Sequence, residues 1–235
     1  MSGIDNGYAG YAVQNLTTST DTVTGTAGND LISGNSTTFA ATDVIQDSVT
    51  TDADILNLSL NSYTSTQATI KNIETINVAG NYVSTGIDLA KVTAAKTVNL
   101  STGITGGTAT VENTTAAAVG EIVAGNNVGT LTVVSANAGT GTTAVKVNTG
   151  SATTIVVGGS DSSAKVDGND VYDITLGSAA TSLTLEANAN GGSQSTADAF
   201  TVKLAGNTLA FNADNGEIET LTLNSTGAAN TLTLT

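Results

Sequence analysis

The sequence predicts an all-β protein, a right-handed parallel β-helix or similar solenoid, with linked β-sandwiches as the alternative. Three observations support this class. Apolar and polar residues alternate over many short runs, threonine and glycine are frequent, and similar strand-and-turn units recur along the chain. Branched side chains pack well on a pleated sheet, whereas glycine and asparagine permit tight turns. Short irregular strands suit a solenoid and a sandwich alike, so both remain open.

The expected strands are the alternating runs between turn residues. In residues 54–60, DILNLSL, the period of two places Leu56, Leu58 and Leu60 on one face and Ile55 on the other. Further runs of this kind occupy residues 73–78, 97–100, 130–134, 144–148, 154–157, 172–176, 182–186, 200–204, 218–223 and 231–234. The pattern therefore extends along most of the chain.

An irregular internal repeat links distant parts of the chain. Residues 70–81 and 215–227 share an Ile-Glu-Thr core followed by alternating residues. Reiteration of this kind is typical of stacked rungs, which need neighbours to bury their apolar faces. Glu74 and Glu219 take polar positions in these units, and we expect solvent around both. The final TLTLT resembles an interrupted strand, which predicts a fragment of a longer chain or a strand passed to a neighbour.

The composition excludes several kinds of catalytic chemistry. The chain contains no cysteine, histidine, tryptophan or proline, and its six basic residues are all lysines. Ser–His and Cys–His pairs and the usual zinc ligands are therefore absent. We expect a protein that is not an enzyme, with a polysaccharide-acting β-helix enzyme as a remote alternative.

The charge distribution points to cations as ligands. The net charge is −14, and the scattered lysines offer no footprint for nucleic acid. No apolar run is long enough to insert into a membrane. The aspartates gather in residues 21–54 and again in residues 161–173, whereas residues 122–160 carry no acid. Such clustering favours divalent-cation binding over a general role in solubility.

The first acidic stretch contains a glycine-rich turn followed by a strand. Residues 25–33 read GTAGNDLIS, in which Gly25 and Gly28 let a turn expose carbonyl groups and Asp30 supplies a carboxylate. Ca²⁺ accepts such oxygens, so we predict a calcium site here. Residues 42–58 follow as a degenerate second unit, and its candidate ligands are Asp43, Asp47, Asp52 and Asp54.

A second candidate calcium site lies near the middle of the chain. Residues 165–173 read KVDGNDVYD, and their candidate ligands are Asp167, Asp170 and Asp173. An ordinary Asp-Gly turn explains this segment equally well.

Residues 25–33 resemble the RTX nonapeptide G-G-x-G-x-D-x-U-x, with Thr26 in place of the second glycine. The order of motifs resembles the repeat region of Gram-negative surface-layer proteins and related RTX-type secreted proteins, most firmly over residues 16–78. This resemblance implies a β-helix-like fold, type I secretion, calcium-dependent folding and lateral self-assembly. It divides the chain into an RTX-like calcium-binding segment, 1–60, and solenoid-like repeats, 61–235.

The function expected from these features is that of an extracellular structural protein at the cell surface or in a secreted matrix. Copies of the chain would assemble, with calcium, into a surface layer or fibre, and cell-surface polysaccharide is a further candidate partner. The alternative is a calcium-stabilised stalk or adhesin domain of a larger type I-secreted protein.

Overall fold

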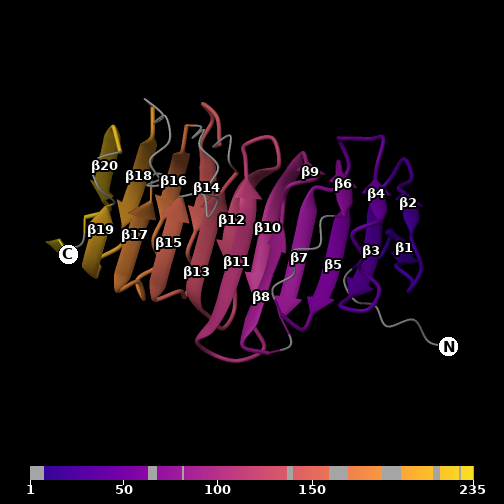
Figure 1. Cartoon of the computed structure of the whole chain (residues 1–235), viewed down its shortest axis with the longest axis horizontal. Coiled ribbons are helices and arrows are strands. Elements are labelled where there is room, and N and C mark those ends of the chain that lie inside the picture. Colours follow the sequence, from indigo (N-terminus) through magenta and orange to yellow (C-terminus); the bar gives the residue numbers. More distant parts are fainter. Residues whose placement is uncertain are drawn as a thin grey trace.

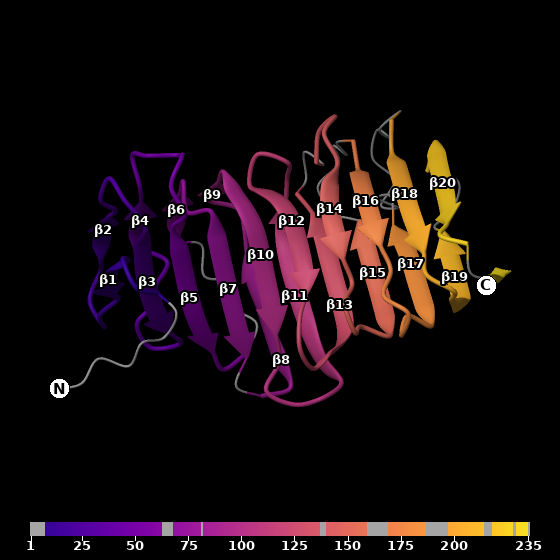
Figure 2. The ribbon, with the colours of Figure 1, turned by 180° about the vertical axis from the view of Figure 1, so that it is seen from behind.

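The alternating runs form short strands that stack in parallel along one axis, as Figure 1 and the reverse view in Figure 2 show. The computed structural model describes residues 8–62, 68–80, 82–136, 140–158, 169–186, 197–213, 218–227 and 229–234. These residues include no helix, and therefore no helix able to cross a membrane. The chain is thus a β-solenoid, which confirms the predicted fold class over linked β-sandwiches.

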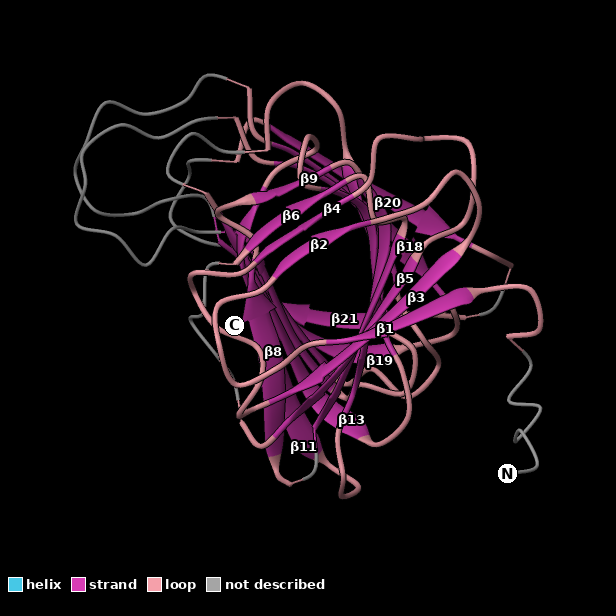
Figure 3. Cartoon of the chain, turned by 90° about the vertical axis from the view of Figure 1, so that its right-hand side faces the viewer, coloured by secondary structure: helices cyan, strands magenta, loops and turns pink. Residues whose placement is uncertain are grey.

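Three sheets enclose the core (Figure 3), and every pairing between described strands is parallel. Sheet A runs the length of the coil and contains β1 (Ala12–Asn15), β3 (Asp30–Asn35), β5 (Ile55–Leu60), β7 (Thr75–Gly80), β10 (Ala95–Ser101), β12 (Val119–Ala124), β14 (Val145–Asn148), β16 (Val171–Thr175), β18 (Ala199–Leu204) and β20 (Thr220–Ser225).

The other two sheets share the length of the coil between them. Sheet B lies in its first part and contains β2 (Thr22–Thr24), β4 (Val44–Gln46), β6 (Thr69–Lys71) and β9 (Val92–Thr93). Sheet C lies in its second part and contains β8 (Ser84–Asp88), β11 (Gly107–Thr114), β13 (Val128–Ser135), β15 (Thr154–Gly158), β17 (Ser182–Glu186), β19 (Thr208–Ala213) and β21 (Thr231–Leu234). In the turn that contains β7, β8 and β9, β7 belongs to sheet A, β8 begins sheet C and β9 ends sheet B. The set of sheets around the core therefore changes at this turn.

The core consists of columns of apolar side chains, one from each rung. Leu56, Leu58 and Leu60 are buried while Ile55 is only half-buried, as the alternation predicts. The column through Leu56 contains, in register, Ile32, Leu56, Ile76, Val98, Ile122, Val147, Ile174 and Val202. Each of these side chains is buried. A rung therefore buries its inner face against its neighbours, as a solenoid requires.

Candidate metal centre

Three successive turns lie above one another at the corner between the end of sheet B and the start of sheet A. They are residues 25–29, 47–54 and 72–74, which follow β2, β4 and β6. Backbone hydrogen bonds hold the corner in register: Gly25 N–H donates to Gln46 O at 2.8 Å, and Asp47 N–H donates to Lys71 O at 3.0 Å. Acids from turns of different sequence are thus brought close together.

A ladder of carboxylates runs through this corner. The Asp30 N–H donates to Asp54 Oδ1 at 2.8 Å, and the Asp54 N–H donates to Glu74 Oε2 at 3.0 Å. Each acid stands at or just before the first residue of its sheet A strand. The carboxylates of Asp54 and Glu74 therefore each accept the backbone N–H of the acid one rung earlier.

The same ladder recurs at the other end of sheet A. The Asp170 N–H donates to Asp198 Oδ1 at 2.8 Å, and the Asp198 N–H donates to Glu219 Oε2 at 2.8 Å. Asp170 and Asp198 are buried, whereas Glu219 is exposed. The recurrence shows that an acid before a sheet A strand is a structural feature of this coil.

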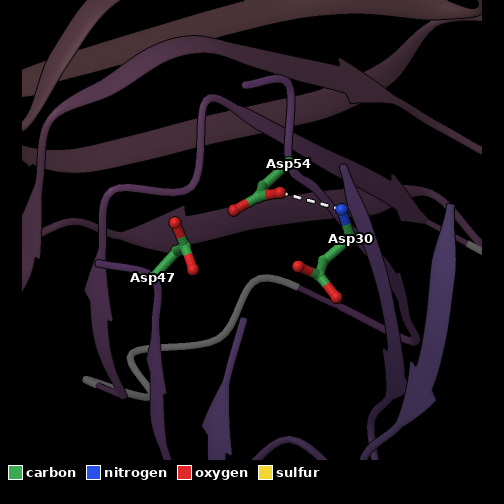
Figure 4. Close-up of side chains that lie close together, drawn as sticks. All are labelled: Asp30, Asp47 and Asp54. Atoms are coloured by element: carbon green, nitrogen blue, oxygen red, sulfur yellow. Dashed lines mark hydrogen bonds between the residues drawn. The ribbon is translucent and has the colours of Figure 1, made fainter. Parts of the chain in front are cut away.

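At the first corner, Asp47 joins the ladder to form a compact group with Asp30 and Asp54. One carboxylate oxygen from each residue lies within 4.8 Å of the other two, and all three side chains are buried (Figure 4). Because calcium–oxygen distances are about 2.3–2.6 Å, one ion placed among these oxygens can reach all three. The predicted ligands Asp30, Asp47 and Asp54 are therefore brought together.

Hydrogen bonds within the described part of the protein leave several carboxylate oxygens at this corner without partners. Asp47 Oδ1, Asp54 Oδ2 and both carboxylate oxygens of Asp52 are buried and have no hydrogen-bond partner. An unpaired buried polar atom costs about 1–3 kcal/mol, and more where it carries charge. A cation at this corner would satisfy these atoms, and the all-oxygen donor set suits a hard ion such as Ca²⁺.

The turn of the glycine-rich motif fixes the first carboxylate. The N–H of Thr26, which replaces the motif's second glycine, donates to Asp30 Oδ2 at 2.6 Å, and its hydroxyl donates to the same oxygen at 3.1 Å. Gly25 packs directly against the Asp47 carboxylate, so that a Cβ at residue 25 would lie 2.4 Å from Asp47 Oδ1. Gly28 is exposed, with open space at its Cβ position, and lies outside the carboxylate group.

Burial and the neighbouring carboxylates oppose ionisation of Asp54. The pKa of Asp54 is raised from its ordinary 3.8 to about 6, chiefly by burial. The charges of Asp52, Asp47 and Asp30 raise this pKa further, while the hydrogen bond from the Asp30 N–H lowers it. At neutral pH the metal-free corner therefore holds a buried charge at a cost in free energy of folding.

This raised pKa predicts a pH dependence for the metal-free protein. The folded state holds the Asp54 proton more tightly than the unfolded state, so Asp54 stabilises the fold most below about pH 4. That contribution is lost as the pH rises through about 6. The measurement is the thermal midpoint of the calcium-depleted protein against pH, with Asp54→Asn as the reference. A difference between the two proteins that stays flat with pH would contradict the assignment.

The two remaining predicted ligands of the first acidic stretch, Asp43 and Asp52, are not members of the group formed by Asp30, Asp47 and Asp54. Asp43 precedes β4 at the opposite end of that strand from Asp47, and its two oxygens accept the N–H groups of Asp21 and Ala40 at 3.0 and 2.8 Å. These bonds suit the turn-capping role of an aspartate. Asp52 lies in the same turn as Asp54, and an oxygen of Asp52 is within 4.8 Å of Asp54 and Glu74 oxygens.

The two described candidates of the middle segment, Asp170 and Asp173, are not gathered into one group. Asp170 points into the coil, whereas Asp173 lies on the outer side of β16, where Lys203 Nζ donates to its carboxylate at 2.9 Å. Asp167 lies outside the described residues.

Glu74 is the acid that the sequence did not single out as a ligand. The expectation that solvent surrounds it is wrong, because only 5% of Glu74 is exposed and its carboxylate accepts the Asp54 N–H. Its sequence signal was its place just before a sheet A strand, which it shares with Asp54. Glu219 holds the corresponding place before β20 and is exposed, as expected.

Comparisons with known proteins identify no relative: no protein-family model, no curated protein and no solved structure matches this chain.

Proposed function

We propose that this chain is a calcium-stabilised structural protein of the cell exterior, which assembles with copies of itself into a surface layer or matrix fibre. The observation that carries the calcium part is the set of buried carboxylate oxygens without partners on Asp47, Asp52 and Asp54. Extracellular calcium modules need only weak affinity, with Kd about 10⁻⁴–10⁻³ M, because the ion is abundant outside cells. Folding would then be complete only at the calcium concentrations found outside cells.

The assembly part is supported by two columns of uncharged side chains on the outer face of sheet C. On β11, β13, β15 and β17 these columns are, in register, Thr108, Thr130, Thr154 and Ser182, and Thr110, Thr132, Val156 and Thr184. All eight are half-buried, and the outward acids of these strands, Glu112 and Glu186, lie beyond the columns. In a chain with a net charge of −14, contact through these columns brings fewer like charges together than contact through a charged face.

The outer face of sheet A is different, because charged residues stand on it. Glu121 lies across from Lys146, and Lys146 lies across from Asp173. Lys203 forms an ion pair with Asp173 at 2.9 Å. Contact between copies through this face would require desolvation of these charges, which favours the face of sheet C.

The test is removal of calcium from the purified protein. We expect ordered sheets or filaments by electron microscopy in calcium, and their loss with a chelator. At calcium a hundredfold above Kd, binding adds about 2.7 kcal/mol, so chelation should lower the thermal midpoint by about 5–10 °C. Unchanged circular dichroism and thermal midpoint after chelation would refute calcium-dependent folding.

A substitution within the uncharged columns of sheet C separates assembly from folding. Thr132→Lys places a charge on the outer side of β13, and we expect it to abolish ordered assemblies while the thermal midpoint stays within a few degrees. Thr97→Lys is the matched control on the outer side of sheet A, where the new lysine would face Glu121. A protein that stays monomeric at every calcium concentration would instead support the stalk or adhesin domain.

A further inference from the structure

A second group of carboxylates lies next to the first and shares one residue with it. Oxygens of Asp52, Asp54 and Glu74 all lie within 4.8 Å of one another. Asp54 is fully buried and Glu74 is 5% exposed, while Asp52 is half-buried as a residue. The group joins the turn before β5 to the turn before β7, one rung further along the coil than the first group.

The free oxygens of this group are themselves buried. Both oxygens of Asp52 and Oδ2 of Asp54 are shielded from solvent and have no hydrogen-bond partner. Glu74 Oε2 accepts the Asp54 N–H, and Glu74 Oε1 lies 3.7 Å from Lys96 Nζ. No hydrogen bond in the described part of the chain relieves the oxygens of Asp52, so a ligand other than the protein is required to satisfy them.

We infer that this corner holds two divalent cations, one among Asp30, Asp47 and Asp54 and the other among Asp52, Asp54 and Glu74, with Asp54 bound to both. The inference rests on the proposed calcium binding and adds the number of ions and the shared ligand. Asp54 Oδ1 already accepts a hydrogen bond, and Oδ2 is the oxygen left to bridge.

The local charge supports two ions over one. The five carboxylates of the two groups and the Lys96 ammonium together carry a charge of −4. One divalent cation leaves −2 in a buried setting, whereas two cancel the charge. Because uncompensated charge is costly in a protein interior, the corner is best satisfied with both sites filled.

Two ions with a shared ligand would tie three successive turns together. The first ion would join the turn before β3 to the turn before β5, and the second would join the latter to the turn before β7. Loss of either ion would leave the other bound to Asp54, with a charge of −2 at the corner.

The experiment counts calcium ions by native mass spectrometry and calorimetry in the full chain. Relative to the unmodified protein, Asp47→Asn and Glu74→Gln should each lose one ion, and Asp54→Asn should lose two. The amide side chains of Asp54→Asn and Glu74→Gln still offer an oxygen to the backbone N–H groups of Asp30 and Asp54, so the turns can persist. The controls are Glu121→Gln and Asp173→Asn on the outer face of sheet A, which should lose none.

Each outcome bears on a different part of the inference. If Glu74→Gln keeps the full number of ions, the second cation is excluded while calcium binding itself stands. If Asp54→Asn loses one ion, the sharing of Asp54 is wrong. If the unmodified protein binds no calcium, the proposed function fails as well.

Circular dichroism of every variant shows whether a lost ion reflects a lost ligand or a lost fold. Asp52→Asn repeats the test of the second cation with a different ligand.

Discussion

Replacement of Asp54 by asparagine is expected to stabilise the protein without calcium and to destabilise it with calcium. Without the ion, the substitution removes a buried charge whose pKa is raised to about 6. One pKa unit corresponds to about 1.4 kcal/mol, so we expect a gain of about 1–3 kcal/mol at neutral pH. With the ion, the variant lacks the ligand common to both carboxylate groups and loses the stabilisation that calcium gives the unmodified protein.

Thermal midpoints of both proteins at neutral pH, with chelator and with excess calcium, measure this reversal. Asp173→Asn is the control, because it changes an outward carboxylate paired with Lys203 and should shift the midpoint equally in both conditions. If Asp54→Asn lowers the midpoint by the same amount in both conditions, Asp54 is not a calcium ligand and its charge does not destabilise the metal-free protein.

The solenoid could be predicted from the sequence because its core depends on local alternation. In DILNLSL, the period of two alone separates the buried Leu56, Leu58 and Leu60 from the half-buried Ile55. Every rung repeats the same local rule, and stacking adds the remaining contacts. The change from sheet B to sheet C at β7–β9 has no comparable local signal, since it depends on how the chain bends between strands.

The candidate site could be predicted only in part, because its residues meet through the register between turns of unequal length. Asp30 and Asp54 are 24 residues apart and Asp54 and Glu74 are 20 apart, yet both pairs make the same hydrogen bond. In the second ladder the spacings are 28 and 21. No fixed repeat connects these acids, so Glu74 looks like an ordinary polar position. Asp43 looks like a ligand, although it lies at the other end of β4.

Substitution of Gly25 by alanine is expected to weaken calcium binding strongly, although residue 25 contributes no carboxylate. A Cβ at this position would lie 2.4 Å from Oδ1 and 2.9 Å from Cγ of Asp47, closer than any stable contact. The carboxylate can rotate away, so the fold should survive. The same rotation removes a ligand from the first carboxylate group. Supporting residues of metal sites typically contribute about 10–100-fold in affinity, and we expect a loss in this range.

Gly28→Ala provides the matched control within the same motif. A Cβ at residue 28 meets no atom within 4 Å, so calcium affinity should remain within about twofold of the unmodified protein. Calcium titration by calorimetry compares the two variants directly. Equal losses would mean that the turn backbone, rather than the Asp47 carboxylate, binds the ion. A loss confined to Gly25→Ala would separate the two motif glycines by function: residue 25 leaves room for a ligand from the next rung, and residue 28 serves only the turn.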